Sequence, residues 1–121
     1  MYVAGLGAAA NGNYTAGLSK NGVITNLTNG TNIAYASSVF ESGNDVFVLG
    51  FEETNNSNSY AMYWENGIIT RLTDGTKQDV AYSVYVFGKD VYIVGYEPPG
   101  TFGNGIAKLW KNGTAQDLSD E

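Results

Sequence analysis

The side chains best suited to binding chemistry in this sequence are aromatic. Trp64 and Trp110 stand at matching places in two similar segments, and Tyr60, Tyr63 and Phe102 lie near them along the chain. Aromatic rings stack on the apolar faces of sugars, while neighbouring Asn and Asp side chains accept hydrogen bonds from sugar hydroxyls. These five residues are the candidate ligand-binding set. A tryptophan repeated in two units is equally typical of packing between the units, which is the commoner use.

Carboxylates are the other candidates for chemistry. A glycosidase needs two carboxyl groups at a defined separation, one of them with a raised pKa, and Glu41, Glu52, Glu53 and Glu97 are the residues available for such a pair. Nothing in the sequence places two of them together, and solvated surface charges are the commoner state of glutamate. The serines have no histidine to activate them, because the chain contains none. We therefore expect a protein that is not an enzyme.

Metal and cofactor sites have little support in the sequence. The chain has no Cys and no His, which removes disulfides and the commonest zinc ligands. No loop spaces its carboxylates like calcium ligands, and turn formation explains Asp45, Asp74 and Asp90. Residues 5–10 match the dinucleotide pattern Gly-x-Gly-x-x-Ala in form, but no helix is expected to follow them. No metal or cofactor is predicted.

These residues lie within a repeated pattern. Gly5, Gly50 and Gly95 recur at intervals of 45 residues, each after a short apolar run. An Asn-Gly pair follows each run at a matching offset, and this dipeptide is the strongest local signal for a two-residue β-hairpin. Sequence periods of roughly 20 to 50 residues indicate solenoids, propellers or arrays. We expect a single repeat domain over residues 1–121, with units at 1–44, 45–89 and 90–121.

Each complete unit is expected to contribute four short strands, and no segment shows helical periodicity. Residues 46–49 and 91–94 are apolar at every position, which is typical of strands buried on both faces. The hairpin arm 68–72 is more polar and is expected to lie outermost. The chain then has eleven strands, one fewer than three complete units need. The loops after the second strand of each unit vary most and are the expected carriers of binding residues: 6–13, 51–59 and 96–105.

Four short patterns define the repeat. They are Asp-Val-Tyr-x-x-Gly-Tyr-Glu at 90–97, Ala-Lys-x-Trp-Lys-Asn-Gly at 107–113, Leu-Thr-Asp-Gly-Thr at 72–76 and Ala-Tyr-Ser-Val at 81–84. Together they resemble the repeat of a group of uncharacterised bacterial β-propeller proteins, and the resemblance covers essentially the whole chain. It implies four-stranded blades around a channel, often in secreted or surface proteins, without a settled activity. The first unit departs from the pattern, because Ser19 stands where the other units have tryptophan.

Fewer than three blades cannot close a ring, since propellers have about four to eight. We therefore expect an all-β partial β-propeller of nearly three four-stranded antiparallel blades, completed by homo-oligomerisation. Two copies in twofold contact would bring about six blades together, so a dimer is favoured. Each seam would still lack one strand, which leaves the edge at residues 2–6 without a partner. The alternative is a β-trefoil, in which three four-stranded units close on themselves within one chain.

Composition limits the partners. The chain has 6 Lys and Arg against 12 Asp and Glu, and its net charge of −6 disfavours nucleic acids and anionic membranes. No apolar run is long enough to span a membrane and no signal peptide is recognisable, so the chain as written is expected to be soluble, with no compartment indicated. We expect a non-enzymatic binding module that presents blade loops to a glycan or a protein. The alternatives are a structural fragment of a larger bacterial surface propeller and, less favoured, a carboxylate-dependent glycosidase.

Overall fold

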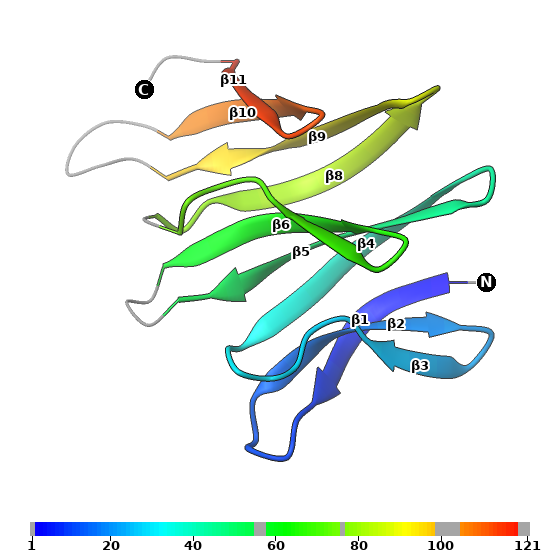
Figure 1. The fold of residues 1–121 in the computed structure, drawn as a ribbon. Helices are drawn as coiled ribbons and strands as arrows, with labels where there is room; N and C mark the ends of the chain where they lie inside the picture. The colour runs from blue at the N-terminus through cyan, green and yellow to red at the C-terminus, as the bar shows by residue number, and fades with distance from the viewer. Residues whose placement is uncertain (1, 55–57, 76, 99–104, 119–121) are drawn as a thin grey trace.

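The computed structural model describes residues 2–54, 58–75, 77–98 and 105–118 (Figure 1). Within these residues the fold is all-β, as expected, and eleven strands form three antiparallel sheets. The first sheet has the order β1 (Tyr2–Ala8), β2 (Tyr14–Lys20), β3 (Val23–Asn26). The second has the order β4 (Ala34–Ser42), β5 (Asp45–Glu53), β6 (Ser59–Glu65), β7 (Ile68–Arg71). The third has the order β8 (Val80–Phe87), β9 (Asp90–Glu97), β10 (Ile106–Lys111), β11 (Thr114–Asp117).

The predicted Asn-Gly hairpin turns are present in all three sheets. Asn21, Asn66 and Asn112 have φ angles of 51°, 51° and 52°, and each following glycine also has a positive φ. Positive φ at both central positions defines the type I′ turn, which matches the twist of the strands that it joins. The Asn66 side chain also accepts a hydrogen bond from the Val46 amide at 2.8 Å and donates one to Asp45 Oδ1 at 2.9 Å. Asn112 repeats both bonds in the third sheet, so this turn is tied to the start of a neighbouring strand.

Two apolar cores lie between successive sheets. Alternate residues of β5 and β6 enter different cores: Val48 and Trp64 enter the core shared with the first sheet, whereas Leu49 and Tyr63 enter the core shared with the third. The second sheet is thus buried on both faces. This burial is the reason why the middle of β5 is apolar at every position.

In each of the two four-stranded sheets, the backbones of the first two strands come into close contact. Both β4 and β8 contain a β-bulge, between Ala36 and Ser38 and between Ala81 and Ser83. The bulge brings a backbone carbonyl against the glycine of the next strand, so a Cβ atom built on Gly50 would lie only 2.0 Å from the Tyr35 carbonyl oxygen. The corresponding distance in the third sheet is 2.1 Å. These strand positions therefore require glycine.

The strand ends bring polar side chains together on one side of the molecule. In Figure 1 the ends of β5 and β9 and the starts of β6, β8 and β10 lie on this side. β4 and β8 come from the end of one sequence unit, but each pairs with the first strand of the next unit. The segment between β7 and β8 therefore crosses from the second sheet to the third. The described residues form no helix long or apolar enough to cross a membrane.

Candidate functional site

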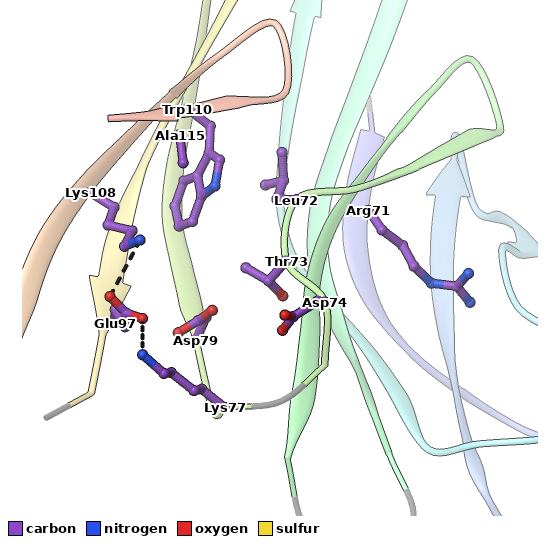
Figure 2. Close-up of a pocket in the computed structure, with 10 residues that line it drawn as sticks. All are labelled: Arg71, Leu72, Thr73, Asp74, Lys77, Asp79, Glu97, Lys108, Trp110 and Ala115. Atoms are coloured by element: carbon purple, nitrogen blue, oxygen red, sulfur yellow. Dashed lines mark hydrogen bonds and ion pairs between the residues drawn. The ribbon is translucent and has the colours of Figure 1, made fainter. Parts of the chain in front are cut away.

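A polar groove lies between the second and third sheets, on the side where β8 and β10 begin (Figure 2). Its walls are the segment that connects β7 to β8 and residues of β9, β10 and β11. The groove has a volume of about 370 Å³. Small-molecule sites commonly have volumes of about 300–1,000 Å³, so the groove is large enough for a small ligand.

Glu97 at the end of β9 is the centre of an ion-pair cluster in this groove. Its Oε1 atom contacts Lys77 Nζ, and its Oε2 atom lies 3.3 Å from Lys108 Nζ. Lys108 also lies 3.2 Å from Asp117 Oδ1, because the two residues are directly opposite each other on β10 and β11. The hydrogen bond from Lys77, together with that from Lys108, holds the pKa of Glu97 below its usual value.

The pKa values of the two lysines shift in the opposite direction from that of Glu97. The pKa of Lys77 is raised, chiefly by its hydrogen bond to Glu97. Burial alone would lower the pKa of Lys108, but its hydrogen bonds to Asp117 and Glu97 outweigh this effect and raise it. Both lysines are therefore fully charged at neutral pH, and each ammonium group has three N–H donors.

Asp79, just before β8, is the second carboxylate of the groove and is only 7% exposed. Its Oδ1 atom has no hydrogen-bond partner among the described residues. Burial, and after it the negative charge of Glu97, raises the pKa of Asp79 above its usual value. Figure 2 shows its carboxylate facing the same space as Glu97 and Thr73. The groove therefore contains a buried acceptor that no described residue satisfies.

The equivalent positions of the second sheet show which residue types the fold accepts in place of Asp79 and Lys108. There Ala34 stands where the third sheet has Asp79, and it is fully buried opposite Glu52. Met62 stands where the third sheet has Lys108, since both residues pair with the strand glycine. Both groove charges thus replace apolar residues of an otherwise equivalent unit. Packing does not explain them, which makes them the functional candidates.

Removal of the Asp79 carboxylate is expected to stabilise the protein at neutral pH. The variant Asp79→Ala should raise the free energy of unfolding by about 1–3 kcal/mol at pH 7, because a buried acceptor without a partner is unfavourable. The folded-state pKa of Asp79 is raised, so the contribution of Asp79 to wild-type stability is most favourable below its unfolded-state value near 3.8 and falls as the pH rises through that value. Urea unfolding should therefore show a smaller gain at pH 3 than at pH 7. An equal gain at both pH values, or a loss at pH 7, would contradict this account.

The four described aromatic residues of the set expected to bind a ligand are not gathered on one surface. Trp64 and Trp110 are each 1% exposed and lie in different cores, and Tyr63 is also buried. Tyr60 is half-buried, and the Arg71 guanidinium lies 4.6 Å from the centre of its ring. Trp110 borders the polar groove. Phe102 lies outside the described residues, and the role of the set in binding stays a prediction.

The glutamates considered for acid and base chemistry are also separated. Glu52 forms an ion pair with Arg71 at 3.2 Å in the second sheet, and Glu53 is half-buried at the end of β5. Glu97 occupies the place equivalent to Glu52 in the third sheet, and the carboxylate beside it is Asp79. Among the described residues, no group of three or more acidic side chains is arranged to hold a metal ion.

Sequence reasoning did not single out Asp79 or the two lysines. One signal was present: sliding the sequence by 45 residues places Asp79 against Ala34, a charge against an apolar residue. Lys108 lies against Met62 at an offset of 46 residues. Where one repeat unit has a charged residue and another has an apolar one, the charged side chain is not needed to fill the core.

Comparisons with family models, with curated proteins and with solved structures found no match for this chain. Its function is therefore argued from the chemistry of the groove. Six charged residues line the groove: Asp74, Asp79, Glu97, Arg71, Lys77 and Lys108. The Arg71 guanidinium is paired with Glu52 and points away from the groove (Figure 2), so the groove itself presents three carboxylates and two ammonium groups. Charges of both signs in one groove are suited to a polar ligand that carries no large net charge.

Proposed function

We propose that this chain is a non-enzymatic binding module whose groove holds a neutral, hydroxyl-rich ligand such as a sugar residue of a glycan. The observation that carries the proposal is the Oδ1 atom of Asp79, which is buried, faces the groove and has no hydrogen-bond partner among the described residues. A ligand hydroxyl that donates a hydrogen bond to this atom would satisfy it. The cost of about 1–3 kcal/mol for the unsatisfied acceptor would then favour binding.

The lysines supply the complementary donors. Lys77 and Lys108 both contact Glu97, but each ammonium group has more N–H donors than that carboxylate uses. A sugar hydroxyl can donate to Asp79 and accept from a lysine at the same time. A strongly anionic ligand would meet the groove carboxylates, and a strongly cationic one would meet the lysines, so the mixed lining favours a neutral ligand.

The proposed scaffold is a partial β-propeller in which each sheet is one blade. Separate sheets, with an apolar core between each successive pair, support the propeller over a trefoil. The third sheet leaves large apolar side chains exposed: Tyr82, Tyr85, Phe87 and Val94. Such surfaces mark association sites. A second copy in twofold contact would cover this sheet and bring about six blades into a ring.

A glycan array followed by calorimetric titration tests the proposed function. We expect Asp79→Ala to weaken binding of the glycan found on the array by at least about tenfold, while the variant remains folded. Glu53→Gln is the matched control, because Glu53 is a carboxylate outside the groove, and it should bind like the wild type. An array without any bound glycan, or equal affinity of Asp79→Ala and wild type, would refute the proposal.

One observation favours a second candidate, a glycosidase-like hydrolase. The pKa of Asp79 is raised and that of Glu97 is lowered, and two carboxyl groups with oppositely shifted pKa values are the usual arrangement of an acid and its partner carboxylate. The ion pairs of Glu97 with two lysines make it a poor base, so binding without reaction ranks first. Chromatography of the bound glycan after incubation with the protein decides between them: cleavage that Asp79→Asn abolishes would establish the hydrolase.

A further inference from the structure

The first sheet has an open edge where the other two sheets have a strand. β5 lies between β4 and β6, and β9 lies between β8 and β10. β1 is the equivalent strand of the first sheet, but in the described part of the chain it pairs with β2 alone. Its backbone N–H and C=O groups on the other edge are therefore available to a further strand.

Gly5 indicates what this edge is shaped to receive. It corresponds to Gly50 and Gly95, which must be glycine because the carbonyl group of a bulged neighbouring strand lies against them. At Gly5 a Cβ atom would meet nothing within 4 Å, and the residue does not have the positive φ that favours glycine. Neither the backbone nor the space around Gly5, as far as the described residues define it, accounts for glycine at this position. A strand with the same bulge, placed along β1, would account for it.

We propose that the open edge of β1 binds a fourth strand of the same type as β4 and β8, supplied by another polypeptide segment. Those two strands share the pattern Ala-x-Ser-Val-aromatic, at residues 36–40 and 81–85. Their register is also shared: the alanine lies opposite the strand glycine, and the valine lies opposite Val48 in one sheet and Ile93 in the other. The incoming strand therefore places its alanine opposite Gly5 and its valine opposite Val3.

The surface around this edge fits an apolar strand. Val3 and Leu6 are 50% and 52% exposed, although both belong to a β-strand. They line a shallow apolar groove of about 190 Å³ that also includes Gly17 and Ile24. The valine equivalent in β4, Val39, packs against the core between the first and second sheets, so an incoming valine has a matching place beside Val3. Main-chain hydrogen bonds would provide affinity and this groove would provide specificity.

A labelled peptide with the sequence of residues 33–43 tests the proposal by fluorescence anisotropy. We expect saturable binding to the wild-type chain. The variant Gly5→Ala should weaken that binding by at least about tenfold, because the new methyl group would meet the peptide carbonyl, and its thermal midpoint should equal that of the wild type. A peptide with aspartate in place of the valine is the matched control and should bind weakly.

Three results would overturn the proposal. The first is equal binding of the peptide by the wild type and by Gly5→Ala, and the second is equal binding of a scrambled peptide. The third is a sizing experiment in which Gly5→Ala converts a dimer into a monomer while the peptide does not bind, since a second copy would then occupy the edge. Glycan binding in the groove is expected to be unchanged by Gly5→Ala, so this test is independent of the proposed function.

Discussion

The variant Trp64→Ala is expected to lower the free energy of unfolding by about 3–5 kcal/mol, because it removes a large buried side chain from the core between the first and second sheets. The indole is 1% exposed and packs with Val48 and Met62 against the first sheet. Domains of this size have total stabilities of about 5–15 kcal/mol, so the loss is a large fraction of the whole. Urea unfolding followed by tryptophan fluorescence and by circular dichroism measures it.

Ser19 provides the control for this variant, since it occupies the place of Trp64 in the first sheet. Ser19 is half-buried but belongs to neither core, so Ser19→Ala should change the stability by no more than about 0.5 kcal/mol. If Trp64→Ala instead remained nearly as stable as the wild type but lost glycan binding, the indole would be a ligand contact and the packing account would be wrong.

The variant Gly50→Ala is expected to lower the free energy of unfolding by about 3 kcal/mol, the upper end of the range for overpacked interiors. A Cβ atom at this position would lie 2.0 Å from the Tyr35 carbonyl oxygen and 3.1 Å from Ala36 Cα. Both contacts are with backbone, so no side-chain rotation relieves them. The β4 bulge must move, which also disturbs the core residues that it carries.

A comparison of the thermal unfolding of Gly50→Ala with that of Gly5→Ala isolates the effect of the contact with the β4 bulge. Both variants add one methyl group to a strand glycine at equivalent places, but a Cβ at Gly5 meets nothing within 4 Å. The Gly5 variant should therefore stay within about 0.5 kcal/mol of the wild type. Equal destabilisation of the two would show that the bulge contact is not responsible.

The strands and turns could be predicted because their causes are local. An Asn-Gly pair specifies its own turn, since the positive φ angles that it needs are properties of those two residues. The apolar run at 46–49 predicted a strand buried on both faces, and Val48 and Leu49 do enter different cores. The same prediction for residues 91–94 was wrong for one face, because Ile93 is buried but Val94 is 41% exposed. The strand count followed from the same patterns, with one strand fewer than three full sets.

The candidate site could not be predicted in the same way. Asp79 and Glu97 are ordinary surface residue types, and nothing next to them in the sequence indicates burial. They come together because β8 pairs with β9 with Val80 opposite Tyr96, which places the residue before β8 beside the last residue of β9. For the aromatic residues, residue type alone suggested stacking on a sugar, but the packing of the sheets buries Trp64, Tyr63 and Trp110.

By itself the sequence determined the all-β class, the type I′ hairpins and the repeat, because backbone preference and side-chain alternation act between near neighbours. The tertiary structure decided which residues the solvent reaches. Burial and the nearby charge of Glu97, neither of which is local in sequence, raise the pKa of Asp79, and its Oδ1 atom has no hydrogen-bond partner in the part of the chain that the structure describes. The sequence already predicted an unpaired edge at residues 2–6, but only the tertiary structure showed why the equivalent positions 50 and 95 need glycine: the carbonyl group of a bulged strand lies against them.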